Sequence, residues 1–85
     1  MSESLIEYPC AFPIKIMGKG EGFADSIQAV VLKHDPEFEA SGMEIRASRE
    51  GKYLSLTCTV KATSREQLDA LYRALCDHPQ VVMVL

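Results

Sequence analysis

The sequence predicts an α+β fold in which two strand–helix–strand units follow one another along the chain. Three observations support this prediction. Apolar and polar residues alternate in two long segments, apolar residues recur every three or four positions in two others, and both helical segments stop at a proline-containing sequence. The 85 residues suffice for one domain only, so we place a single domain at residues 1–85, with a short lead-in segment over residues 1–9.

The first unit contains one strand and one helix. A strand is predicted over residues 10–18, because apolar residues occupy every second position from Phe12 to Ile16. From Phe23 the apolar spacing changes to three and four residues, which is typical of a helix with one buried side. The helix is predicted to stop near Asp35-Pro36, because a residue that precedes proline disfavours helical geometry.

A β-hairpin and a second helix follow. The residues alternate over 43–48 and again over 53–62, and the short connection between these segments contains Gly51. This pattern predicts two strands joined as a hairpin. The second helix is predicted to begin at Thr63 or Ser64, because each is followed three residues later by Glu or Gln, as in a capping box.

The chain closes with a helix stop at Asp77-His78-Pro79 and a last strand over residues 81–85. The predicted element order is therefore βαββαβ, which is that of the ferredoxin-like fold. Right-handed crossovers place both helices on one face of a four-stranded antiparallel sheet with the strand order 4-1-3-2. The opposite face of the sheet is expected to be open.

Composition and charge exclude several classes of protein. The formal net charge is -3 and the basic residues form no run, so we expect no nucleic-acid binding. The acidic start does not resemble a secretory signal, and no apolar segment approaches the ~20 residues that cross a bilayer. Three widely spaced cysteines without a C-x-x-C pair favour reduced thiols. We therefore expect a cytoplasmic protein without membrane contact.

A glycine-rich segment between the first strand and the first helix is the candidate ligand site. Gly18, Lys19, Gly20 and Gly22 lie where backbone N–H groups at a helix start can hold an anion. The segment matches neither the dinucleotide-binding nor the Walker A pattern, and Glu21 repels phosphate. Two interpretations stay open: a small-molecule site, or a turn whose glycines only supply positive φ.

Catalytic and metal-binding arrangements are not recognisable in the sequence. Acylphosphatases share this element order and use an Arg in the first loop and an Asn on a neighbouring strand, but this loop has no Arg and the chain has no Asn. His34 and His78 are expected at opposite ends of antiparallel helices, too far apart to share an ion. Cys58 is expected on the inward face as a small apolar residue. We therefore expect no enzyme activity, cofactor or metal.

The last strand is apolar on both faces and is the candidate contact surface. In the predicted strand order it lies at the sheet edge, beside the first strand, which carries Met17 on its outer face. An apolar edge favours pairing with another chain, so Met17, Val82 and Val84 are predicted interface residues of a homodimer or of a complex with a protein partner. In the alternative, the N-terminal residues Leu5, Ile6 and Tyr8 cover this edge.

A resemblance to a known family rests on short motifs spread over nearly the whole chain. These motifs are Tyr8-Pro9, the segment 12–18, the segment 48–55, Ala62-Thr63-Ser64 with Gln67, Leu71-Tyr72, and the last five residues. Together they resemble the YbeD-like family of small bacterial proteins, a group without an assigned function.

The resemblance implies a regulatory role. Members of that family are similar in fold to ACT-type regulatory domains, which bind small effectors near the first loop and at dimer interfaces. Their genes often lie beside lipoate-attachment genes. The expected function is therefore an ACT-like regulatory or binding domain that acts through a small ligand or a protein partner. The alternative is a protein-interaction module linked to lipoate metabolism, without a small-molecule ligand.

Overall fold

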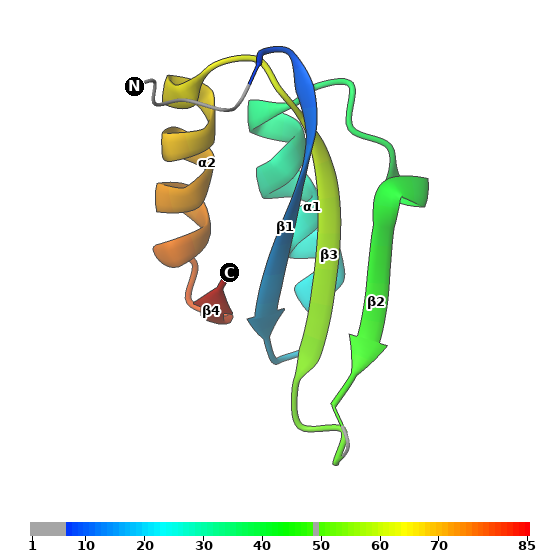
Figure 1. Ribbon diagram of the computed structural model, residues 1–85. Helices are drawn as coiled ribbons and strands as arrows, with labels where there is room; N and C mark the ends of the chain where they lie inside the picture. Colours follow the sequence, from blue (N-terminus) through cyan, green and yellow to red (C-terminus); the bar gives the residue numbers. More distant parts are fainter. Residues whose placement is uncertain (1–6, 49) are drawn as a thin grey trace.

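The computed structural model describes residues 7–48 and 50–85, and Figure 1 shows their arrangement. The elements are β1 (Cys10–Gly18), α1 (Phe23–His34), a short 3-10 helix (Ala40–Gly42), β2 (Met43–Ala47), β3 (Leu54–Ala62), α2 (Arg65–Cys76) and β4 (Val81–Val84). The strands form one antiparallel sheet in the order β2-β3-β1-β4. This is the predicted order 4-1-3-2 viewed from the other side, so the ferredoxin-like α+β fold is confirmed.

The two central strands, β1 and β3, pair over their full length of nine residues, from Cys10↔Ala62 to Gly18↔Leu54. The outer strands are about half as long. β4 pairs with β1 only over residues 16–18, and the pairing of β2 with β3 ends at Met43↔Cys58. Within the described ranges, the first half of β1 and the last residues of β3 therefore have a strand neighbour on one side only.

The core lies between the sheet and the two helices. Side chains with even numbers on β1 and β3 point toward the helices, which agrees with the predicted alternation; most are buried, and Cys10, Phe12 and Leu54 at the strand ends are half-buried. The largest fully buried side chains are Ile14, Ile16, Phe23, Ile27, Val31, Leu56, Cys58, Val60, Leu71 and Leu75. The odd-numbered side chains point to the other face of the sheet, which no described element covers. We call this the open face.

Two polar side chains form hydrogen bonds with the backbone at the start of α2. Ser64 is the N-cap, and its hydroxyl accepts a hydrogen bond of 3.0 Å from the backbone N–H of Gln67. The Gln67 amide oxygen in turn accepts from the N–H of Thr63 at 2.7 Å. This reciprocal pair is a capping box shifted by one residue, and it shows that Ser64, not Thr63, begins the helix.

Each of the two long helices has twelve residues. In the part of the chain that the structure describes, no helix is long and apolar enough to cross a membrane.

Leu71→Ala tests the packing of α2 on the sheet. Leu71 is fully buried, so the substitution removes apolar contacts and leaves a cavity. The free energy of unfolding should fall by about 2–5 kcal/mol, measured by urea denaturation. Asp69→Ala, on the exposed side of the same helix, is the control and should change it by less than about 0.5 kcal/mol. Equal losses in the two variants would show that this helix does not pack as described.

Candidate functional site

The glycine-rich segment forms a tight loop that is bound to the connection between α2 and β4. Gly20 and Gly22 have φ angles of +107° and +72°, so the expectation that glycine supplies positive φ here is confirmed. The Gln80 side-chain amide donates hydrogen bonds to the carbonyl oxygens of Lys19 (3.3 Å) and Glu21 (3.1 Å). The backbone N–H of Lys19 donates to the Gln80 carbonyl at 3.1 Å. Backbone groups of this loop are therefore already hydrogen-bonded to Gln80.

Gly18, at the start of this loop, is required for packing. A Cβ atom at this position would lie 2.3 Å from the Phe23 ring and 2.4 Å from the Gln80 carbonyl oxygen. Neither Gly18 nor its neighbours Lys19, Gly20 and Gly22 line the cavity described below. The structure thus explains Gly20 and Gly22 by backbone geometry and Gly18 by close packing, and a ligand at this loop stays a prediction.

The last strand presents large apolar side chains to the surface. The exposed fractions are 54% for Val82, 48% for Met83 and 62% for Leu85. Met83 lies beside Met17 in the register of β1 and β4, so the two methionines share the open face. We call Met17, Val82, Met83 and Leu85 the β4 surface.

An irregularity in the pairing of β4 with β1 changes the interpretation of Val84, one of the predicted interface residues. The register of β1 and β4 shifts between Met17 and Gly18, so strict alternation does not hold along β4. As a result Val81 and Val84 both pack against the core, whereas Val82 is exposed. Val84 therefore contributes its backbone, more than its side chain, to the sheet edge.

The proposed cover for this edge lies mostly outside the described residues. Leu5 and Ile6 are not among them, and Tyr8 is 37% exposed. Tyr8 precedes Cys10, whereas β4 pairs with the opposite end of β1, at residues 16–18. Tyr8 is therefore too far along the strand to cover the β4 surface.

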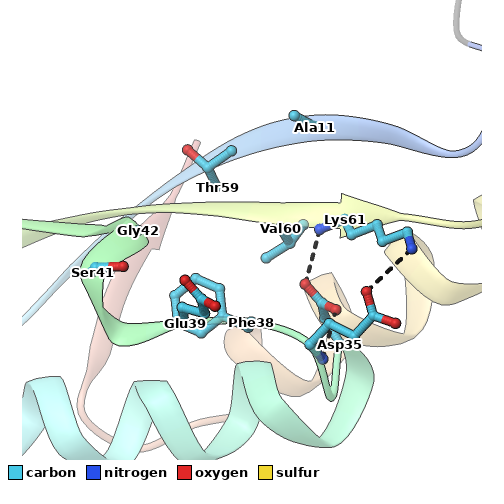
Figure 2. Close-up of a pocket in the computed structure, with 10 residues that line it drawn as sticks. Ala11, Asp35, Phe38, Glu39, Ser41, Gly42, Thr59, Val60 and Lys61 are labelled. Carbon is cyan, nitrogen blue, oxygen red and sulfur yellow. Dashed lines mark hydrogen bonds and ion pairs between the residues drawn. The ribbon is translucent and has the colours of Figure 1, made fainter.

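A cavity of about 360 Å³ lies beside the last residues of β3, beyond Met43, where β2 begins (Figure 2). Asp35, which is only 4% exposed, occupies its floor, and its carboxylate accepts hydrogen bonds from the backbone N–H groups of Lys61 (2.9 Å) and Glu37 (3.2 Å). The Lys61 ammonium pairs with Glu37 at 3.2 Å. Ala11, Asp35, Glu37, Phe38, Glu39, Ser41, Gly42, Thr59, Val60 and Lys61 line the cavity.

The Asp35 carboxylate accepts the hydrogen bond that a neighbouring strand would otherwise accept from Lys61. The backbone N–H of Lys61 points to the side where β2 no longer pairs, and the carboxylate satisfies it. Gln67 has a similar role on the other side of the same corner, because its amide nitrogen donates to the carbonyls of His34 (2.8 Å) and Lys61 (3.0 Å). Sequence analysis missed both roles. It interpreted Asp35-Pro36 as a helix stop and Gln67 as part of a capping box.

The titratable side chains do not converge. Within residues 7–48 and 50–85, no group of three His, Cys, Asp or Glu side chains could hold a metal ion. His34 Nδ1 lies 3.0 Å from the Val30 carbonyl oxygen, and His78 Nδ1 accepts from the Gln80 N–H at 3.1 Å. Each histidine thus contacts a nearby backbone group, His34 at the last residue of α1 and His78 just after α2.

The three cysteines differ in exposure. Cys76 is exposed, Cys10 is half-buried and Cys58 is buried, as predicted for the inward face of its strand. Burial raises the pKa of the Cys58 thiol from 9.0 to about 11. Because the unfolded chain releases this proton at lower pH than the folded one, Cys58 lowers stability as the pH rises from 9 toward 11.

Gly18→Ala tests the packing role of the glycine loop. The added methyl group must displace the Phe23 ring or the Gln80 backbone, so we expect a loss of about 1–3 kcal/mol in the free energy of unfolding. Gly42→Ala is the matched control, because the nearest atoms to its Cβ position are 3.8 Å and 3.9 Å away. Urea denaturation followed by circular dichroism measures both; a Gly18→Ala variant as stable as the control contradicts this packing.

Thiol labelling tests the placement of the cysteines. At mildly alkaline pH, a disulfide reagent should modify the exposed Cys76 rapidly and Cys58 only after unfolding, because the thiolate is the reacting form. Cys76→Ala should abolish the fastest phase, and Cys58→Ala should leave it unchanged. Loss of the fast phase in the Cys58 variant would contradict the burial of this thiol.

Comparisons with known proteins agree with this fold. A family model described as a protein of unknown function (DUF493) matches residues 3–85. UPF0250 proteins from Nitrosomonas europaea and Bordetella pertussis are 61% and 60% identical over 84 residues, which cover 98% of this chain and 97% and 92% of theirs. Their names indicate no enzyme activity.

A solved structure shares the fold at low sequence identity. The solution structure of an H. pylori protein has a TM-score of 0.81 and 14% identity, and the match covers 98% of this chain and 88% of that one. At this identity the likeness shows the fold alone. The family model and the bacterial relatives also confirm the resemblance to the YbeD-like family, and the chain belongs to the DUF493 family of small bacterial proteins.

Proposed function

We propose that this chain is a non-catalytic binding module whose β4 surface pairs two copies into a dimer. The observation that carries the proposal is the exposure of Val82, Met83 and Leu85, of which each is about half exposed or more. Three neighbouring large apolar side chains at a sheet edge are costly to leave in water. Their burial against another chain is favourable by roughly 25 cal/mol for each Å² of apolar surface.

The backbone at this edge supports strand pairing. Leu85 exchanges two hydrogen bonds with Lys15, at 2.7 Å and 3.2 Å, so its backbone groups point toward β1. In an antiparallel ladder the groups of the adjacent residue, Val84, then point away from β1. They are available to a strand that approaches from outside.

The composition of β4 suits a second copy of the chain. In a two-fold dimer the strand meets its own antiparallel copy, so like charges would face each other. The residues from Val81 to Leu85 carry no charged side chain. The other edge of the sheet, β2, carries exposed Glu44 and Arg46, which are typical of an edge that avoids pairing.

The size of the edge sets the expected strength of the dimer. β4 has four residues, and its contact is smaller than the ~800 Å² per partner of stable complexes. We therefore expect a reversible, concentration-dependent dimer. Such an equilibrium is suited to a regulatory role, because a small change in concentration or in a second contact shifts it.

The ACT-like effector site at Gly18, Lys19, Gly20 and Gly22 has less support. Gln80 already satisfies carbonyl groups of this loop, and the loop does not line the cavity described above. The link to lipoate metabolism follows from the family resemblance and is independent of these contacts. Both stay predictions.

Val82→Lys tests the dimer. A lysine at the paired edge places like charges against each other, so the variant should remain at the mass of one chain, 9.4 kDa, where the wild type approaches twice that value. Sedimentation equilibrium up to about 1 mM measures this, a range in which even millimolar dissociation constants are detected.

Ile45→Lys provides the matched control for this substitution. Ile45 is 55% exposed, about the same as Val82 at 54%, but it lies on β2 at the far side of the sheet. This variant should assemble as the wild type does. A wild-type protein that stays monomeric over the whole range, or equal dissociation of both variants, would refute the proposal.

A further inference from the structure

We propose that the open face of the sheet binds an acidic, amphipathic segment of another protein. The proposal rests on the meeting of three cations, which have no ion-pair partner among the described residues, with a row of methionine and hydroxyl side chains on one uncovered face. It is tested separately from the dimer, because Lys15 and Arg46 lie outside the β4 surface, although Met17 and Met83 belong to both surfaces.

The charge of the open face is opposite to that of the rest of the chain. Lys15 and Arg46 lie on this face by register, and Lys19 reaches it because its ammonium lies 5.8 Å from the centre of the Tyr53 ring. Glu44 also lies on this face, as does Lys61, which is already paired with Glu37. The remainder of the sequence, which includes Glu37, has five basic and eleven acidic residues, so the basic character is local to this face.

These cations have no carboxylate partner among the described residues. The two salt bridges within the described ranges are Lys52 with Glu50 and Lys61 with Glu37. Lys15, Lys19 and Arg46 are therefore available to an external carboxylate. A partner with acidic side chains complements them, whereas a second copy laid face to face would place like charges together.

The cations flank an apolar strip. The register places Met83, Met17, Ser55 and Arg46 in one row across the four strands. This row spans about 14 Å at a strand spacing of ~4.8 Å, which exceeds the width of one helix, ~10 Å. An amphipathic segment can therefore place its apolar side on the methionines and its acidic side near Arg46.

The side chains of this face are suited to such a contact. Methionine is flexible and polarizable and fits apolar partners of different shape. Ser55 and Thr57, both half-buried on β3, offer hydroxyl groups to carboxylates or backbone groups. The face is thus apolar on the β4 side and polar toward β2.

A nucleic acid fits the same face less well. Ferredoxin-like domains that bind RNA stack bases on aromatic side chains of the two central strands. Here Tyr53 is the aromatic residue beside that surface; it is half-buried, and Lys19 lies over its ring. The eleven acidic residues elsewhere would also repel a long phosphate chain.

Fluorescence anisotropy tests the proposal with a designed probe. The probe is a labelled eighteen-residue helical peptide with a leucine stripe and glutamates on its flanks, measured at about 0.15 M salt. It should bind the wild-type protein, and Lys15→Glu/Arg46→Glu should weaken binding at least about tenfold, since two attractive contacts become repulsive. Lys33→Glu/Arg65→Glu makes the same change in net charge on the helices and should weaken it less than about threefold.

Further arms of the experiment separate the alternatives. Amide shifts in the NMR spectrum of the protein should centre on Met17, Ser55 and Thr57 when the peptide is added. A single-stranded RNA that binds as tightly as the peptide overturns the proposal, as do equal losses in the two charge variants or no binding of the peptide. The sedimentation of Lys15→Glu/Arg46→Glu should match that of the wild type. Failure of the peptide proposal would therefore leave the dimer proposal intact, and failure of the dimer proposal would leave the peptide proposal intact.

Discussion

The nine-residue pairing of β1 with β3 is the constraint on which the other elements depend. It aligns the inward side chains of the two strands into one buried face, with Ile14 beside Cys58 and Ile16 beside Leu56. Both helices pack on that face, and each outer strand attaches to only part of one central strand. The partial outer strands in turn decide where the backbone of the sheet stays unpaired, and hence where contacts with other molecules can form.

Three polar side chains form hydrogen bonds with backbone groups at strand ends, helix ends and loops. Asp35 accepts from the Lys61 N–H beyond the end of β2, Gln67 joins the ends of α1 and β3, and Gln80 holds the glycine loop. Each is local in sequence to a turn but acts on a residue distant in the chain. An unmet backbone group in such a place costs about 1–3 kcal/mol, so these contacts matter in a domain of this size.

The fold could be predicted because its determinants are local. Alternation over β1 and β3, the spacing in the helices and the stops before Pro36 and Pro79 each act within a few residues. The candidate site was harder to predict. The register shift between Met17 and Gly18 depends on how β4 meets β1, and it exposes Val82, which strict alternation places on the same face as the core-packed Val84. The same holds for Asp35, whose partner Lys61 is 26 residues away.

The glycine loop is a second place where the sequence alone could not define the site. Its sequence is typical of both a turn and an anion site, because both use glycine for its backbone freedom. What separates them is the neighbour that comes from the other end of the chain. Gln80 contacts Gly18, Lys19 and Glu21, and its hydrogen bonds reach residues 61 and 59 positions earlier in the chain, so no motif in the loop encodes it.

The difference between the two sheet edges has a consequence for the growth of any assembly. On the β2 side, charged Glu44 and Arg46 occupy the strand, and Asp35 closes the stretch of β3 beyond it. On the β4 side the edge is apolar and uncharged. If β4 pairs as proposed, a sheet with one apolar edge and one charged edge can extend only once, across a two-fold axis, and then presents the charged β2 edges to solution. The difference between the edges would then stop growth at the dimer and keep the apolar strand from forming fibres.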